Sequence, residues 1–300
     1  MRSIEQSLDI ETLFTVVFML VDDWFKRNPR RQVGRKAIFS DSEVVSLVLV
    51  MDFVPYPSER QYLAYVRANY LPLFPRLLDQ SQFNVRARSL RYAVEQLRKH
   101  WQHKLLEEVQ TYLLLDTKPV PVMTYKRSEA HSDFVDSAAY GYCASRSMKY
   151  YGYKLVMFSS LDGLPISYEL AAANTDERRA AEELLEQFPT THLLTDKGFI
   201  GDFWQQELRD SLGITILCPK RRNQKPNDPG LEPLWGSLRQ RVEGVFNELQ
   251  NLGKNLERLS AKTVVGLTAR VAALITSHTL KLLLKRSFGF DVQSFSVRQP

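Results

Sequence analysis

The spacing of apolar residues along the chain changes near residue 110. Before this point, "SERQYLAYVRANY" (58–70) and "FNVRARSLRYAVEQLRKHWQHKLLEEVQ" (83–110) carry apolar residues three to four positions apart, which is typical of helices with one buried face. In "IFSDSEVVSLVLVMDFV" (38–54), Ser40 precedes Glu43 by three residues, a capping-box pattern at the start of a helix. Proline-bearing segments separate these runs. The pattern predicts a small all-helical domain over residues 1–105.

Beyond residue 110, short apolar runs of strand length alternate with helical segments. The dipeptide Asp162-Gly163 joins two strand-like runs within residues 150–173, which is a strong hairpin signal. The other expected strands are "TYLLLDT" (111–117), "HLLTD" (192–196) and "ITILCP" (214–219), and the expected helices are "TDERRAAEELLEQF" (175–188), "GDFWQQELRDSLG" (201–213) and most of residues 232–259. This order predicts an α/β domain over residues 106–290, with a mixed sheet covered by helices on both faces, and a C-terminal tail over 291–300.

Two details of this region are specific predictions. Residues 118–150 do not fit the alternation, and we expect an insertion or a long loop there. The helix over 175–188 has Thr175 as its expected N-cap and acidic residues in its first turn, which suit the positive end of a helix dipole.

Charge and cysteine content narrow the class of protein. The 300 residues include 40 Lys and Arg against 34 Asp and Glu, and the basic residues cluster in segments 25–36, 84–100 and 218–225. This distribution is compatible with a nucleic-acid partner, although solvated loops and helix faces explain each cluster as well. The two cysteines have no paired spacing, which argues against a disulfide framework. Because the N-terminal apolar run is too short to span a bilayer, we expect a cytoplasmic protein with no membrane partner.

Two aspartates end expected strands. Asp116 closes "LLLD" and Asp196 closes "HLLTD". Ligands of mixed sheets gather beyond the carboxyl ends of the strands, so these side chains face one another if their strands are neighbours. An aspartate at a strand end is also a common turn former or helix cap, and that interpretation stays open for each residue.

A third carboxylate is expected on the last helix of the domain. Glu243 lies at the border of the apolar face, with Arg239 one turn earlier, so an ion pair with Arg239 is the alternative explanation, and Glu232 and Glu248 are competing candidates. Three carboxylates that converge from two strands and a helix would suit Mg²⁺ or Mn²⁺, and two such ions promote in-line phosphoryl transfer.

The ordered segments "LLLDT", "YYGYKLV", "LLTDKGFIG" and "RQRVEGVFNEL" resemble the acidic-triad (DDE) transposases of bacterial insertion sequences, most closely insertion-sequence group nine-eighty-two. The resemblance covers residues 35–285. It implies a ribonuclease H-like catalytic fold, in which Asp116, Asp196 and Glu243 are the catalytic, metal-binding carboxylates.

The same resemblance assigns further residues. "DKGF" (196–199) matches the family pattern "DKGY" with Phe199 in place of tyrosine. Lys197 stands beside the second carboxylate, Arg239 matches the basic residue one turn before the glutamate, and Lys154 in "GYK" is a candidate contact to the DNA backbone. All three are expected to bind DNA.

The expected function is therefore metal-dependent cleavage of DNA at the ends of an element and strand transfer into target DNA. The partners would be the terminal inverted repeats and the target, both double-stranded, held by a homodimer. Arg86 and Arg88, within the arginine-rich segment 81–91, are candidate DNA contacts of a recognition helix, although a packing helix with a basic outer face explains the segment nearly as well. The main alternatives are a non-enzymatic DNA-binding protein derived from a transposase and a metal-dependent nuclease of the same fold. A metal-free hydrolase with paired carboxylates is a further alternative, although the flanking Lys and Arg residues suit phosphate better than sugar.

Overall fold

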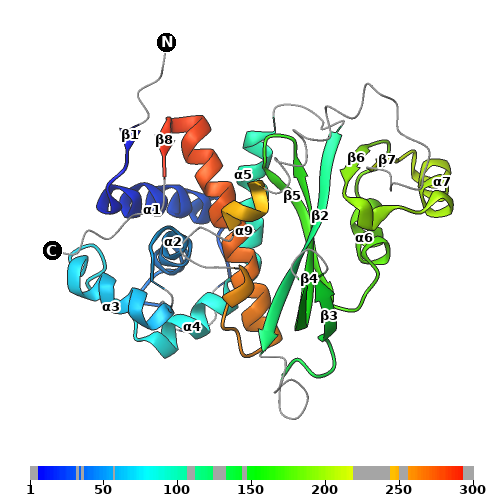
Figure 1. The fold of residues 1–300 in the computed structure, drawn as a ribbon. Helices are drawn as coiled ribbons and strands as arrows, with labels where there is room; N and C mark the ends of the chain where they lie inside the picture. Colours follow the sequence, from blue (N-terminus) through cyan, green and yellow to red (C-terminus); the bar gives the residue numbers. More distant parts are fainter. Residues whose placement is uncertain are drawn as a thin grey trace. The chain divides into compact units, whose positions relative to one another are not determined.

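The structure is a computed structural model that describes residues 6–31, 34, 37–56, 58–106, 112–123, 133–143, 147–218, 244–249 and 256–292. The chain forms two compact units. Unit 1 contains residues 1–105 and 249–300, and unit 2 contains residues 106–248. Figure 1 shows the helices of unit 1 and the sheet of unit 2.

Unit 1 is mainly helical. Its elements are β1 (Gln6–Ser7), α1 (Ile10–Arg27), α2 (Asp41–Val50), η1 (Met51–Phe53), α3 (Glu59–Asn69), α4 (Gln80–Ser89), α5 (Arg91–Leu105), η5 (Leu256–Arg258), α9 (Val264–Phe288) and β8 (Phe290–Asp291). The capping box predicted at Ser40 is present, because the backbone N–H of Glu43 donates to Ser40 Oγ and the Ser40 N–H donates to Glu43 Oε2. The predicted N-terminal helical region is confirmed.

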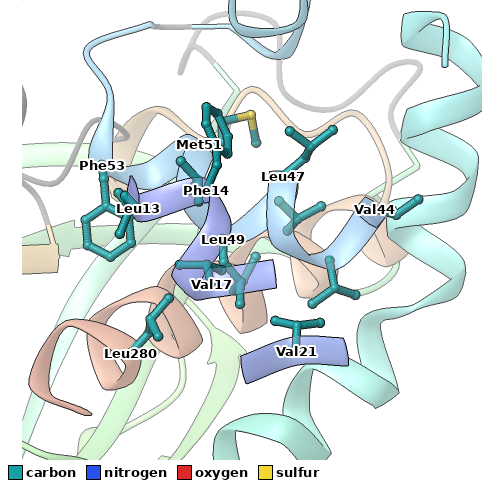
Figure 2. Packing of buried hydrophobic residues seen from close by; sticks show 14 of the residues in the cluster. Leu13, Phe14, Val17, Val21, Val44, Leu47, Leu49, Met51, Phe53 and Leu280 are labelled. Carbon is teal, nitrogen blue, oxygen red and sulfur yellow. The ribbon is translucent and has the colours of Figure 1, made fainter. Parts of the chain in front are cut away.

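The core of unit 1 combines the N-terminal helices with α9. Figure 2 shows side chains of α1, α2 and α9 meeting, among them Phe14, Leu47 and Leu280, each exposed by 1% or less. Thirteen residues of α9 are buried, and four of them, Ala273, Leu280, Leu283 and Leu284, belong to the core of unit 1. The helix is long and apolar enough to cross a membrane, but 72% of its most apolar window is buried inside the protein, as in a core helix.

The division of the chain differs from the expected boundary at residue 290. Residues 249–300, which include α9, group with the N-terminal helices, and α9 packs against α5 and α2. The physical reason is that α9 buries Ala273, Leu280, Leu283 and Leu284 in the core that the N-terminal helices form. It therefore completes the core of unit 1, and unit 2 is an insertion into unit 1.

Unit 2 is built on a mixed six-stranded sheet. Its strands are β2 (Tyr112–Met123), β3 (Ala139–Cys143), β4 (Met148–Ser160), β5 (Pro165–Ala172), β6 (His192–Thr195) and β7 (Thr215–Leu217), and its longer helices are α6 (Glu177–Leu185) and α7 (Asp202–Leu212). The order is β3-β4-β2-β6-β7, with β5 also paired to β4. The pairs β2/β6 and β6/β7 are parallel and the others are antiparallel. Helix α6 packs against β4 and β5, and α7 against β7, which confirms the mixed α/β class expected of a ribonuclease H-like domain.

The hairpin and the end of α7 agree with the sequence predictions. Strands β4 and β5 are antiparallel, and Gly163 in their turn has φ of +89°, a conformation that favours glycine. Gly213 ends α7 in the left-handed conformation, with φ of +67°.

The prediction of an insertion or a long loop over residues 118–150 was wrong for the part of this range that the structure describes. Strand β2 continues to Met123 through Pro119 and Pro121, and β3 and the start of β4 also fall in this range. The prolines obscured the strand in the sequence because proline donates no ladder hydrogen bond. They are tolerated because, among the strands that the structure describes, β6 pairs only with Tyr112–Leu115, and β4 is the partner of β2 at the prolines.

Candidate active site

Asp116 lies in β2, one residue beyond the last pair that β2 shares with β6. That parallel register ends with Leu115 opposite Thr195. The prediction that Asp116 ends a strand was wrong, because β2 continues past it and Asp116 stands opposite Met157 of β4. The strand β2 does not end at Asp116, but its pairing with β6 ends just before it, at Leu115. The carboxylate therefore sits on a continuous, rigid strand and is partly buried.

Asp196 follows β6 directly and is exposed. Its Oδ1 accepts a hydrogen bond of 2.8 Å from the backbone N–H of Gly198, so it caps the short turn η4 (Lys197–Phe199). The turn-forming interpretation of Asp196 is thus correct. It does not exclude a second role, because Asp116 and Asp196 are the next residues after the last β2/β6 pair and lie at the same edge of the sheet.

Negative charge accumulates at this edge. Burial, together with the charges of Asp196 and Glu177, raises the pKa of Asp116 to about 7, although its hydrogen bond with the Thr117 N–H acts in the opposite direction. Burial, and next the charge of Asp196, also raise the pKa of Glu177. These carboxyl groups are therefore held where their ionisation is unfavourable in the absence of a cation.

Glu177 is the carboxylate that the sequence analysis did not find. Its Oε1 accepts a 2.9 Å hydrogen bond from Thr117 Oγ1, next to Asp116. Its Oε2 lies 1.8 Å from the position that a Cβ on Gly198 would occupy. Glu177 therefore contacts residues that follow both aspartates, and Gly198 leaves the space for its carboxylate.

Two features of the sequence concealed Glu177. Its position in the first turn of a helix was attributed to the helix dipole, and the expected N-cap, Thr175, was wrong by one residue. The N-cap is Asp176, whose Oδ1 accepts from the Arg178 N–H, so Glu177 is the first residue of α6. The available signal was Gly198, since a glycine next to a strand-end carboxylate is typical of close approach by another group.

Several predicted site residues lie outside the part of the chain that the structure describes. These are Glu243, Arg239 and the side chain of Lys197. Within the described residues, no three His, Cys, Asp or Glu side chains are arranged to hold a metal ion. Phe199, which replaces the tyrosine of the family pattern, is fully buried and packs on Trp204 with ring centroids 6.4 Å apart, a setting that requires no hydroxyl.

The predicted DNA contacts have different surroundings. Lys154 Nζ donates to the carbonyl of Thr175 at 2.6 Å and its charge acts on Glu177, so it belongs to the candidate site. Arg86, in unit 1, donates to the Phe39 carbonyl and to Asp41 Oδ1, both at 2.5 Å, which is a structural role at the start of α2. Arg88 lines a cavity of unit 1.

The residues at the sheet edge fit a divalent cation. The donor set of Asp116 and Asp196 consists of carboxylate oxygens, which are the ligands that Mg²⁺ and Mn²⁺ prefer. Burial, and to a lesser extent the charges of Asp196 and Glu177, raise the pKa of Asp116, so a nearby cation would favour its ionised form. A cation bound here would offset the repulsion between the carboxylates.

We expect the stability of the metal-free protein to depend on Asp116. The pKa of Asp116 is about 7 in the folded chain against an ordinary value of 3.8. Protonated Asp116 therefore makes its full favourable contribution to the free energy of unfolding below pH 3.8, and this contribution is lost as the pH rises through 7. With chelator at pH 8, Asp116→Asn should therefore melt about 3–6 °C above the wild type. The difference should vanish near pH 4. If Asp116→Asn and the wild type differ in melting temperature by the same amount from pH 4 to 8, ionisation of Asp116 is not the reason for the difference.

Comparisons with known proteins place the chain in a family. No curated protein matches it in sequence. Two solved structures that resemble it are "Crystal structure of the Mos1 Strand Transfer Complex" (15% identity, 88% of this chain and 85% of that chain, TM-score 0.23) and "Crystal structure of the Mos1 mariner paired end complex with Mn" (15% identity, 95% and 100%, TM-score 0.20). The transposase DDE domain family matches residues 107–280, more than half of the chain. The chain belongs to the family of transposases with a DDE domain.

Proposed function

We propose that this protein is a transposase that cuts DNA at the ends of its element and joins the freed 3′ ends to target DNA. The observation that carries the proposal is the placement of Asp116 and Asp196 side by side where the β2/β6 pairing ends, in a chain of the DDE transposase family. DNA is the proposed substrate, and a homodimer would hold two element ends together.

Asp116 and Asp196 would hold the divalent cations, Mg²⁺ or Mn²⁺, two in number. Strand β2 fixes the backbone of Asp116, and the Gly198 N–H orients the carboxylate of Asp196. The cations supply charge stabilisation and an activated oxygen nucleophile at the reacting phosphate. Other side chains of the protein would then hold a DNA strand so that its reacting phosphate lies next to Asp116 and Asp196.

The reaction is a pair of phosphoryl transfers. In cleavage, a water oxygen forms a bond to phosphorus, the bond from phosphorus to the 3′ oxygen breaks, and the proton lost by water balances the one gained by the 3′-hydroxyl. In joining, that 3′-hydroxyl oxygen forms a bond to a target phosphorus, the bond from this phosphorus to the target's 3′ oxygen breaks, and the proton lost by the attacking hydroxyl balances the one gained by the displaced 3′ oxygen. Both steps place negative charge between the carboxylates, which is why a cation is required.

Glu243 is proposed as the third carboxylate. Residues 244–249, directly after it, are helical, and Lys118 Nζ lies 5.6 Å from the centre of the Phe246 ring. Lys118 is two residues beyond Asp116 on β2, and side chains two apart share a face of a strand. This supports an approach of the Glu243 segment to the sheet near Asp116.

Lys154 is proposed to bind the DNA backbone with Lys197 and Arg239. Lys154 and Lys149 line a hollow of unit 2 together with Tyr140 and Tyr142. Both tyrosines are exposed, at 38% and 61%, and aromatic side chains next to lysines offer both stacking and charge to a DNA strand.

The test is an assay with end-labelled duplexes that carry the element's flanking sequence, in Mg²⁺, in Mn²⁺ and in chelator. Metal-dependent joined products are expected. Cleavage without joining in either metal would show a nuclease, and binding without cleavage would show a DNA-binding protein that has lost its activity. Either result would overturn the transposase proposal.

The position of Glu177 gives a second prediction for the same site. Gly198→Ala places a methyl group where Glu177 Oε2 lies, so the flexible glutamate must move away from Thr117. We expect Gly198→Ala and Glu177→Ala each to weaken Mn²⁺ binding about tenfold, measured by calorimetry. In the double variant, the second change should add almost nothing, because both remove the same contact. Additive losses would show that the two residues act independently.

A further inference from the structure

Unit 1 contains a cavity of about 550 Å³ that the reaction at the sheet edge does not use. It is lined by the start of α3, by α4 along its length, by the first turns of α9 and by the residues just before α9, and Val48, Met51 and Val94 form part of its apolar wall. In Figure 1, α4 and α9 belong to the same helical unit, and the two helices are in contact. The remainder of the lining includes further apolar residues, among them Leu259 and Ala269, and a set of polar and charged side chains.

Four cationic side chains line this cavity: Arg60, Arg88, Lys262 and Arg270. The acidic residue of the lining, Glu59, accepts hydrogen bonds from the side-chain amides of Gln80 at 2.8 Å and Asn84 at 3.3 Å, which are uncharged donors. Of the carboxylates that the structure describes, none pairs with Arg60, Arg88 or Lys262. The cavity therefore carries an excess of positive charge.

Arg270 supplies the strongest indication of a ligand. Its side chain is 14% exposed, and Nη2 binds Oδ1 of the fully buried Asp52 at 2.6 Å. Its Nε and Nη1 are buried and have no acceptor among the described residues. Buried donors are rarely left unpaired, because an unmade hydrogen bond costs about 1–3 kcal/mol. Two free N–H positions on a planar guanidinium suit an anion with several oxygens.

The first turn of α9 faces the same cavity. Thr263 caps this helix by accepting from the Gly266 N–H at 3.0 Å, and both residues line the cavity. The Cδ of Arg88 lies 3.8 Å from the position that a Cβ on Gly266 would take, so the arginine reaches across the start of the helix. The positive end of the α9 dipole therefore adds to the four cations.

We propose that this cavity binds a phosphate of the DNA backbone, with Arg88, Lys262 and Arg270 as its ligands. That the phosphate belongs to DNA rests on the proposed function. That the cavity binds an anion rests on the buried donors of Arg270 that have no acceptor among the described residues and on the excess positive charge of the lining. The apolar wall formed by Val48, Met51 and Val94 suits a deoxyribose next to the bound phosphate.

Binding of the full-length protein to a labelled duplex of about 30 base pairs, roughly three helical turns, tests the proposal in chelator, where no cleavage occurs. Anisotropy is followed as NaCl is raised. Arg88→Ala and Lys262→Ala should each weaken binding about fivefold near 0.1 M salt and reduce the salt slope by about one. The control is Lys99→Ala, which removes an exposed lysine of α5 in the same unit. These variants leave the ion pair of Arg270 with Asp52 intact.

Equal effects of the cavity variants and Lys99→Ala would overturn the proposal. Inorganic pyrophosphate is the second probe. If it raises the melting temperature of the wild type but not of Arg88→Ala, while duplex binding is unchanged in that variant, the cavity serves a small phosphate compound and the backbone assignment is wrong. If the cavity variants lose DNA affinity but the wild type cleaves no DNA in any metal, the inference holds and the proposed function fails.

Discussion

Replacing Asp196 by asparagine is expected to lower DNA cleavage and strand transfer by at least about 1000-fold. A carboxylate that binds a catalytic cation contributes several kcal/mol to the transition state, and about 4 kcal/mol corresponds to that factor in rate. The fold should survive, because the amide oxygen of asparagine still accepts from the Gly198 N–H that the aspartate now binds. Rates are measured with single turnovers on labelled element ends.

The matched control is Asp210→Asn, the same chemical change on an exposed residue of α7. It should cleave and join DNA like the wild type. Binding of the element ends in chelator should be retained by Asp196→Asn, which separates catalysis from recognition. Glu243→Gln should show the same loss as Asp196→Asn if Glu243 is the third carboxylate. Transfer by Asp196→Asn at the wild-type rate would refute the assignment of the site.

Replacing Gly152 by alanine is expected to lower the melting temperature of unit 2 by about 10 °C or more. A Cβ at this position would lie 2.3 Å from the Val120 carbonyl oxygen, and the φ of Gly152 is +155°, where side chains are strained. The clash is with backbone, so no side-chain rotation relieves it. Overpacking and strain together should cost at least about 3 kcal/mol of folding free energy. A loss of this size lowers the melting temperature of a domain of this length by about 10 °C.

The control for this variant is Gly244→Ala. Gly244 is helical, and a Cβ there would meet nothing within 4 Å. Alanine in a helix is favoured over glycine, so this variant should melt at or slightly above the wild-type temperature. Both variants are compared by calorimetry and circular dichroism. A Gly152→Ala protein as stable as Gly244→Ala would mean that β2 and β4 separate easily at the prolines.

The sequence predicted those parts of the site that depend on local patterns. An apolar run that ends in aspartate identified Asp116 and Asp196, and the Asp162-Gly163 turn identified the hairpin. Glu177 depends on a tertiary contact, because only the packing of α6 against the sheet brings it to Thr117 and Gly198. No spacing along the chain encodes that contact.

The arginines of α4 show a similar limit. Arg86 and Arg88 are equivalent in the sequence, two residues apart in one basic segment. Their side chains have different neighbours, since Arg86 is bound to Asp41 and the Phe39 carbonyl, whereas Arg88 reaches the start of α9. That difference arises from residues more than forty positions away and is decided by packing.

The insertion of unit 2 into unit 1 has a consequence for synthesis on the ribosome. Helices α1 to α5 are made first, but the helix that fills their core, α9, follows only after all of residues 106–248. At about 5–20 residues per second, the apolar faces of the early helices wait many seconds for their partner. Unit 2 has its complete sheet before then. A chain interrupted before α9 would carry both aspartates but no finished unit 1, so a nascent chain acquires the sheet edge with Asp116 and Asp196 before the basic cavity of unit 1.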